Sequence, residues 1–158
     1  PGSAVGKGYY NDPEKTAETI TPDGWFRTGD LGVMDEDGYL SITGRLKEMF
    51  VVGGYNAYPA EIEGVLHTHP KVKMAQTFGV PDGRLGEVGC AYIELRSGEE
   101  TDEADIVEFC KERMANYKVP RYVRFVNAVD FPLTSSGKVK KFELRKRAVD
   151  FFGIEEGV

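Results

Sequence analysis

Strand-like and helix-like segments follow one another along this chain without a regular strand–helix–strand repeat, and this order constrains the fold more than any other feature. Short apolar or β-branched runs, typical of strands, occur at residues 49–52, 71–80, 87–95 and 122–126. Patterns typical of helices occupy residues 59–66, 102–114 and 140–152. Because parallel α/β folds alternate strands and helices strictly, this interleaving predicts an α+β fold, with a small mixed sheet and flanking helices.

The first part of the chain predicts a short helix and a β-hairpin. Asp12 and Pro13 suit the cap and the first turn of a helix that continues to about residue 20. The hairpin is expected over residues 31–43, where two β-prone runs flank a turn that ends in Asp-Gly. A calcium loop would need a Glu at the end of a twelve-residue loop, which this acidic segment lacks. We therefore interpret the segment as a turn.

Composition and charge exclude several classes of protein. With 20 Lys+Arg against 26 Asp+Glu the net charge is −6, whereas nucleic-acid binding generally needs positive charge. No apolar run approaches the ~18 residues that a membrane span needs. Cys90 and Cys110 lie in apolar surroundings without metal-ligand spacing, which predicts reduced core thiols in a cytoplasmic protein. His67 and His69 have no ligand partners at suitable spacing, so no metal site is predicted.

The polar loop at residues 132–138 (Pro-Leu-Thr-Ser-Ser-Gly-Lys) ends in an outward-reaching lysine. A Walker phosphate-binding loop would require Gly at position 132 and Ser or Thr at position 139, but the chain has Pro and Val there. Taken alone, this loop is typical of a surface turn.

Four segments taken in order carry a stronger signal than any one of them. They are residues 24–30 (Gly-Trp-Phe-Arg-Thr-Gly-Asp), 44–49 (Gly-Arg-Leu-Lys-Glu-Met), 53–63 (Gly-Gly-Tyr-Asn-Ala-Tyr-Pro-Ala-Glu-Ile-Glu) and 132–138. Together they closely resemble the C-terminal portion of the adenylate-forming superfamily, which includes acyl- and aryl-CoA synthetases. Within that superfamily, residues 53–63 resemble the CoA ligases rather than the adenylation domains that load a carrier protein.

The resemblance implies a domain organisation. Residues 1–46 would be the tail of a large N-terminal AMP-binding domain, including the hairpin, and residues 47–158 the mobile C-terminal domain. The family's phosphate-binding loop does not occur in this chain, so the chain is expected to be inactive without its own N-terminal domain.

The resemblance also implies roles for residues near the nucleotide. Asp30 would bind the ribose hydroxyls of ATP, and Arg45 would approach the ribose and phosphates. Lys138 would catalyse adenylation, since an ammonium group stabilises the negative charge that accumulates as a carboxylate attacks the α-phosphorus. In some bacterial relatives a lysine acetyltransferase modifies this lysine, which would make such an enzyme a partner.

Further positions would serve domain movement and the second substrate. Lys47 matches the family's hinge, which absorbs a large backbone change. Gly53 and Gly54 would line the tunnel for the pantetheine arm of coenzyme A, bordered by Tyr55 and Asn56, because glycine allows close approach of a ligand.

The implied reaction is ligation of a carboxylate to CoA through an acyl-adenylate, consuming Mg2+-ATP and releasing AMP and diphosphate. A fatty or other hydrophobic acid is the expected substrate. Two alternatives are a stand-alone binding or regulatory module with unused motifs, and an adenylation domain that loads a carrier protein. A third, nucleic-acid binding by the basic residues 138–147, is disfavoured by the net charge of −6.

Overall fold

The computed structural model describes residues 2–155 and divides the chain into two compact units, Pro1–Ile42 and Thr43–Val158. The domain boundary expected after residue 46 concerns the whole protein and stays a prediction. Among the described residues, no helix is long and apolar enough to cross a membrane.

The first unit contains one helix and most of a hairpin. Helix α1 (Pro13–Thr19) begins where the Asp12 carboxylate accepts the N–H of Lys15 at 2.9 Å. The hairpin pairs β1 (Asp30–Met34) with β2 (Leu40–Arg45), whose last residues belong to the second unit. The Asp35 carboxylate accepts backbone N–H groups across the turn, at 3.1 Å and 2.8 Å, which confirms the turn interpretation. No described residue of this unit is buried.

A five-stranded sheet forms the centre of the second unit, with the path β4-β3-β6-β5 and β7 paired to β6. Its strands are β3 (Phe50–Val52), β4 (Tyr55–Ala57), β5 (Val72–Asp82), β6 (Gly86–Leu95) and β7 (Tyr122–Phe125). The β6–β7 pair is parallel and the other pairs are antiparallel. The predicted α+β class with a mixed sheet is therefore confirmed.

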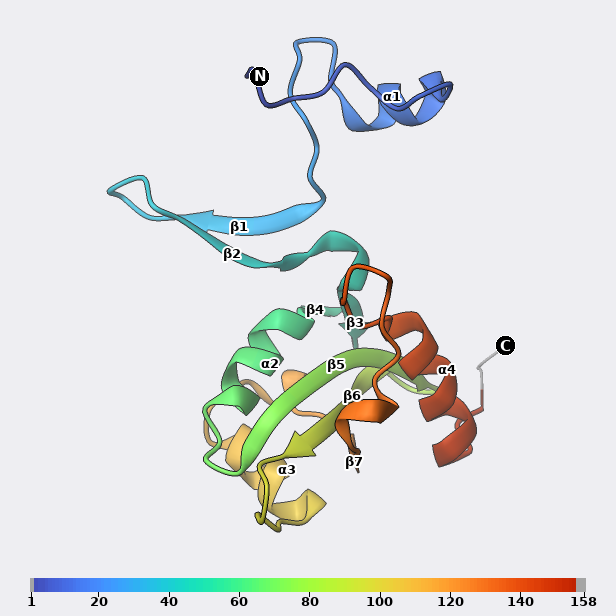
Figure 1. Ribbon diagram of the computed structural model, residues 1–158. Helices are drawn as coiled ribbons and strands as arrows, with labels where there is room; N and C mark the ends of the chain where they lie inside the picture. The colour runs from blue at the N-terminus through green and yellow to red at the C-terminus, as the bar shows by residue number, and fades with distance from the viewer. Residues whose placement is uncertain (1, 156–158) are drawn as a thin grey trace. The chain divides into compact units, whose positions relative to one another are not determined.

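Three helices flank this sheet (Figure 1). Helices α2 and α4 both contact β5, and α3 contacts α2 and β7. The helices are α2 (Pro59–His67), α3 (Glu103–Lys111) and α4 (Lys141–Phe152), with short 3-10 turns η1 (Leu46–Glu48), η2 (Asn116–Lys118) and η3 (Ala128–Asp130).

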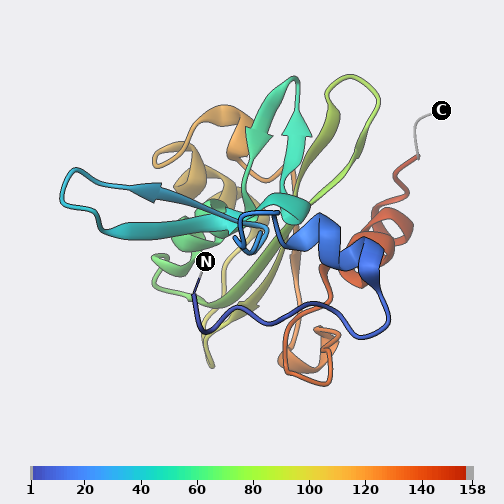
Figure 2. The same ribbon diagram turned by 90° about the horizontal axis from the view of Figure 1, so that it is seen from above.

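The tips of two hairpins meet at one end of the sheet. The N–H of Gly53, in the β3–β4 turn, donates to the carbonyl of Leu85 at 2.8 Å, and Val52 pairs with Gly86. Figure 2 shows the turquoise β3–β4 hairpin beside the yellow-green β5–β6 hairpin. This junction brings residues 53–56 against the β5–β6 turn.

One hydrophobic core lies between the sheet and the helices of the second unit. Its buried residues include Phe50, Ile62, Leu66, Val72, Val80, Tyr92, Ile93, Ile106, Val123 and Leu144. Cys90 and Cys110 are free and buried in this core, as the sequence predicts.

The elements differ from the expected ones in three places. β4 was not expected, because residues 55–57 are too few to show an alternating pattern. β5 continues through Pro81 to Asp82, where Pro81 pairs with Glu87. α3 ends at Lys111 rather than at residue 114, because the chain tightens there: the N–H groups of Arg113 and Met114 both donate to the carbonyl of Cys110.

Candidate functional site

Lys138 ends a tight loop whose own backbone closes it. The Thr134 N–H donates to the Lys138 carbonyl at 2.8 Å, and the Lys138 N–H donates to Thr134 Oγ1 at 3.0 Å. Gly137 has a φ of +79°, a conformation that residues with a side chain rarely adopt. The loop therefore presents the exposed Lys138 side chain from a defined turn between η3 and α4.

The second unit brings Lys138 together with two other predicted site residues that lie about ninety residues earlier in the sequence. Arg45, Lys47 and Lys138 line one pocket of about 470 Å³. Arg45 ends β2 and Lys47 lies in the η1 turn. Phe50 and Phe78 form an apolar part of the wall. Four separate segments supply its lining, within residues 45–50, 78–79, 87 and 134–145, so nearness in the fold, rather than in the sequence, assembles the pocket.

The lining of this first pocket is rich in positive charge. Among the described residues it has six cationic side chains, Arg45, Lys47, Lys138, Lys140, Lys141 and Arg145, and two carboxylates, Glu48 and Glu87. Lys140 is ion-paired with Glu143, Lys141 with Glu48 and Glu63, and Arg145 with Glu87. The cationic excess favours an anionic ligand such as a phosphate chain.

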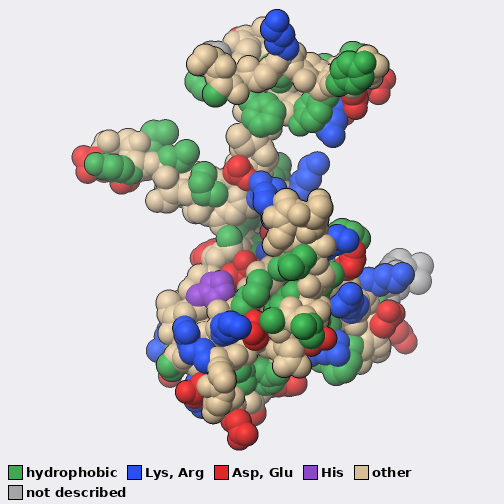
Figure 3. All heavy atoms as spheres, in the orientation of Figure 1, with side chains coloured by type: hydrophobic (Ala, Val, Ile, Leu, Met, Phe, Trp, Pro, Cys, Tyr) green, Lys and Arg blue, Asp and Glu red, His purple; other side chains and the backbone are tan. Residues whose placement is uncertain are grey.

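These ion pairs also account for the basic stretch at residues 138–147. Arg147, the last cation of that stretch, donates to the Asp130 carbonyl at 2.9 Å and lies 3.9 Å from Glu143. On the face shown in Figure 3, basic and acidic side chains of the second unit are intermixed. Four cations of the stretch, Lys140, Lys141, Arg145 and Arg147, are thus engaged with carboxylates or backbone.

Gly53 and Gly54 form the two-residue turn of the β3–β4 hairpin. Their φ angles are +56° and +89°. A hairpin turn with both central residues at positive φ strongly favours glycine. A Cβ on Gly53 would lie 3.1 Å from Leu85 Cδ2, whereas one on Gly54 would meet nothing within 4 Å. Gly53 is thus held against the neighbouring hairpin, and Gly54 is open to solvent or to a ligand.

A second pocket, of about 520 Å³, lies beside this turn. Gly53 and Tyr55 line it, whereas Gly54 and Asn56 do not. The Tyr55 ring stacks on Tyr117, with centroids 5.0 Å apart and an interplanar angle of 25°. Tyr55 is 63% exposed, so a ligand has access to this aromatic wall.

Sequence reasoning missed the far side of this second pocket. The cations Arg84, Lys111 and Arg121 line it, together with Tyr117. Tyr117 to Arg121 is an aromatic and basic run that precedes strand β7 directly, and this pattern could have identified the segment. Arg121 is ion-paired with Asp82, and Lys111 is 3.2 Å from Glu108.

Asp30 belongs to the first unit, where it is the first residue of β1. Its N–H donates to Thr28 Oγ1 at 3.0 Å, and Gly29 before it has a φ of +75°. The Thr-Gly-Asp segment is thus a turn that leads into a strand, and the Asp30 side chain is half-buried.

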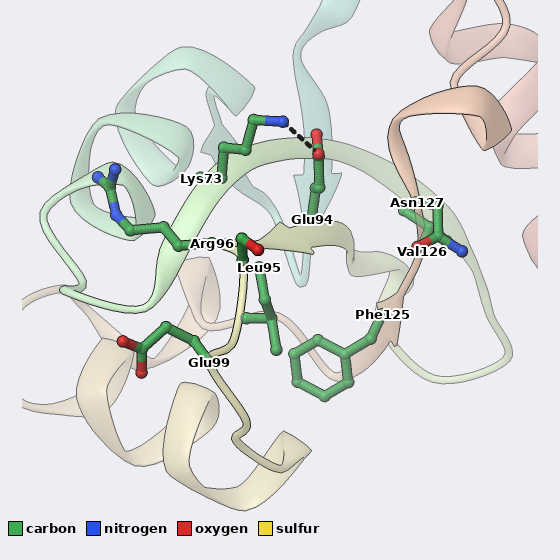
Figure 4. Close-up of a pocket in the computed structure, with 9 residues that line it drawn as sticks. Lys73, Glu94, Leu95, Arg96, Glu99, Phe125, Val126 and Asn127 are labelled. Atoms are coloured by element: carbon green, nitrogen blue, oxygen red, sulfur yellow. Dashed lines mark hydrogen bonds and ion pairs between the residues drawn. The ribbon is translucent and has the colours of Figure 1, made fainter.

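A third pocket of the second unit, about 860 Å³ and larger than the two above, contains none of the predicted site residues. Figure 4 shows the Lys73–Glu94 ion pair, 2.6 Å long, on one side and Phe125 with Leu95 on another. Arg96 Nε donates to the Pro70 carbonyl at 2.9 Å. Lys73, Glu94 and Arg96 are thus engaged with one another or with backbone.

The two histidines serve the fold. His67 Nε2 accepts the Ala75 N–H, and His69 Nδ1 accepts the Lys71 N–H, both at 3.2 Å. Among the described residues, no group of three or more His, Cys, Asp and Glu side chains is arranged to hold a metal ion.

Comparison with known proteins identifies the middle part of the second unit. Residues 61–138 match the family model of the AMP-binding enzyme C-terminal domain. The match begins at residue 61, after the Gly53–Gly54 turn. It ends at Lys138 and so includes the loop at residues 132–138.

Similar proteins extend the match to nearly the whole chain. The chain is 47% identical to the putative acyl-CoA synthetase YngI of Bacillus subtilis, over 97% of this chain and 28% of that protein. It is 50% identical to the mitochondrial medium-chain acyl-CoA ligase ACSF2 of Rattus norvegicus, over 92% of this chain and 23% of that protein. The chain thus spans about a quarter of the length of these relatives.

Solved structures agree with this assignment. ATP-bound MatB from Rhodopseudomonas palustris superposes with a TM-score of 0.82 and 39% identity, over 92% of this chain and 29% of that chain.

Proposed function

Because this chain belongs, over residues 61–138, to the AMP-binding enzyme C-terminal domain family, we propose that it is the C-terminal part of an AMP-forming carboxylate–CoA ligase. The observation that supports this most is the pocket that gathers Arg45, Lys47 and Lys138. Three predicted roles, nucleotide contact, hinge and catalysis, then meet at one place in the second unit.

In the first half-reaction, a carboxylate oxygen of the substrate attacks the α-phosphorus of Mg2+-ATP. The bond from that phosphorus to the bridging oxygen breaks, giving acyl-AMP and diphosphate. Two anions approach each other in this step, so the Lys138 ammonium lowers the barrier electrostatically. Arg45 contacts the ribose and phosphates, and the Asp30 carboxylate accepts hydrogen bonds from the ribose hydroxyl groups.

In the second half-reaction, the CoA thiol attacks the acyl carbonyl of acyl-AMP and AMP leaves. The Gly53–Gly54 turn and the Tyr55 side of the second pocket would accept the pantetheine arm. Asn56 would border the arm from the adjoining strand β4. The two pockets share no lining residue. A rotation of the C-terminal domain about Lys47 could therefore exchange one pocket for the other at a single reaction centre.

The substrate proposed for the whole protein is a fatty or other hydrophobic carboxylic acid. The name of the ACSF2 relative supports this class, since it specifies medium-chain acyl groups. The similarity to acyl-CoA ligases disfavours the stand-alone module and the carrier-loading domain as functions.

Three finer points belong to the same proposal. Mg2+ would enter bound to ATP, and Lys138 would be the target of a lysine acetyltransferase, because it is exposed at the loop end. A cytoplasmic location is proposed from the free buried thiols of Cys90 and Cys110. The relative ACSF2 is named as mitochondrial, so localisation of the tagged full-length protein is the test of that location.

The test is carboxylate-dependent ATP–diphosphate exchange by the full-length protein that contains this chain, across a panel of acids. Lys138→Ala should lower the exchange rate by about 10²–10³-fold, as loss of a preorganised charge contact does. The control Lys146→Ala removes an exposed lysine of α4 and should exchange at the parent rate.

The 158-residue chain alone should show no exchange. If Lys138→Ala exchanges as fast as the parent, the catalytic assignment is wrong, and the binding or regulatory alternative gains support.

A further inference from the structure

Lys141 opens helix α4, three residues after Lys138, and its ammonium group lies between two carboxylates. Lys141 Nζ is 2.9 Å from Glu48 Oε2 and 2.9 Å from Glu63 Oε1. The Lys141 side chain is 17% exposed, which is low for a lysine. One cation thus joins three segments: the η1 turn, helix α2 and the start of α4.

Glu63 is the fixed side of this arrangement. Its Oε1 accepts the Thr77 N–H at 2.7 Å and is 3.3 Å from Thr77 Oγ1, which donates to the Pro59 carbonyl at 3.1 Å. The Thr77 side chain is fully buried in β5, and the Glu63 side chain is 14% exposed. Glu63 therefore anchors Lys141 to the rigid sheet and to α2.

Glu48 is the side that reaches the proposed hinge. It follows Lys47 directly in the η1 turn, and its side chain is 39% exposed. Because an ion pair near solvent is weaker than a buried one, the Lys141–Glu48 contact is the easier of the two to break. The arrangement can hold the hinge segment without making it immovable.

We propose that Lys141 is a positioning residue that holds the Lys47 hinge segment and the Lys138 loop in register for adenylation. This inference rests on the proposed function. Glu63 fixes the Lys141 ammonium against the sheet, and the same ammonium holds Glu48. The start of α4, from which the Lys138 loop extends, and the end of the hinge segment therefore keep a set spacing. Since rate depends steeply on placement of a catalytic group, loss of this contact should slow the Lys138-dependent step.

The experiment measures both half-reactions in the full-length protein. Lys141→Met should lower ATP–diphosphate exchange by about 10- to 100-fold, because a misplacement of about 1 Å can cost about 100-fold in rate. Thioester formation from supplied acyl-AMP and CoA should change less than about twofold, since it uses the other pocket. Lys141→Arg should restore exchange, because it keeps a cation between the carboxylates. The matched control, Lys146→Met, should leave both rates unchanged.

Lys141→Met leaves Glu63 buried without its cation, which destabilises the fold. A second variant therefore separates a loss of positioning from a loss of folding. Glu48→Gln removes only the exposed carboxylate and should keep the parent melting temperature while lowering exchange. In the Lys141→Met background, Glu48→Gln should have no further effect, because the contact is already lost.

Equal loss of both half-reactions, or parent-level exchange by Glu48→Gln, would overturn the positioning role. Failure of the proposed function has a different signature, since Lys138→Ala would then exchange normally. If Lys138→Ala abolishes exchange while Glu48→Gln and Lys141→Met do not alter it, only the inference on Lys141 fails.

Discussion

His69 shows how a single side chain couples the fold to pH. It is 4% exposed, its Nδ1 accepts the Lys71 N–H, and its ring meets Phe109 edge-on at 4.6 Å. Burial lowers the pKa of His69 below its ordinary value of 6.5, although Asp105 opposes this shift. Burial therefore disfavours the protonated form of His69 in the folded protein.

Stability should consequently fall as pH drops below 6.5. The unfolded chain gains a proton on this residue before the folded chain does, so the contribution of neutral His69 is complete above that pKa and is lost below it. The measurement is urea unfolding at about pH 7.5 and about pH 5.5, with His69→Gln as the variant that does not titrate. The variant should lose less stability between the two pH values than the parent. An equal loss in both would assign the pH dependence to other groups.

The two cysteines give a second prediction at this scale. Burial raises the pKa of Cys90 to about 12 and that of Cys110 to about 11. Only the thiolate reacts readily with disulfide reagents, so both thiols should be inert in the folded protein and both should react in urea. Titration with an aromatic disulfide reagent, with and without urea, measures this. Rapid reaction of either thiol in the absence of urea would show that its side of the core opens.

At the scale of elements, glycine positions decide how closely strands and side chains approach. A Cβ at Gly79, in β5, would lie 2.5 Å from the Cβ of Phe50, which is itself 2% exposed. By contrast, a Cβ at Gly64 in α2 would meet nothing within 4 Å. The same substitution should thus have opposite effects at the two sites.

Gly79→Ala should lower the free energy of unfolding by about 1–3 kcal/mol, because β5 and β3 would have to separate around Phe50. Gly64→Ala should raise it by about 0.5–1 kcal/mol, since alanine restricts the unfolded chain and favours the helix. Urea unfolding of the two variants beside the parent tests the pair. A stable Gly79→Ala protein would mean that Phe50 can move aside at little cost.

At the scale of the whole molecule, the hydrophobic core lies entirely within residues 43–158. The buried cluster runs from Phe50 to Ala148, and no described residue before Thr43 is buried. The second unit should therefore fold without the first. A chain of residues 43–158 should unfold cooperatively, with a melting temperature within about 3 °C of the full 158-residue chain. Calorimetry of both chains is the measurement, and a shift much larger than this would show that the first unit stabilises the second.

Local pattern was sufficient to predict most elements of the fold. The apolar runs at residues 71–80 and 87–95 mark β5 and β6, and Asp12 with Pro13 marks the start of α1. These features depend on neighbours in sequence, since capping, alternation and helical period are local properties. The motif order further predicted the family, which the match over residues 61–138 confirms.

Only the tertiary structure decided which residues meet. The sequence predicted roles for Arg45, Lys47 and Lys138 separately, but not that they line one pocket. The sequence likewise did not predict that Tyr117 stacks on Tyr55, or that Lys141 lies between two carboxylates. Such contacts depend on the strand order β4-β3-β6-β5 and on β7 lying parallel to β6. Strand order follows from burying one shared core, which is a property of the whole unit rather than of any segment.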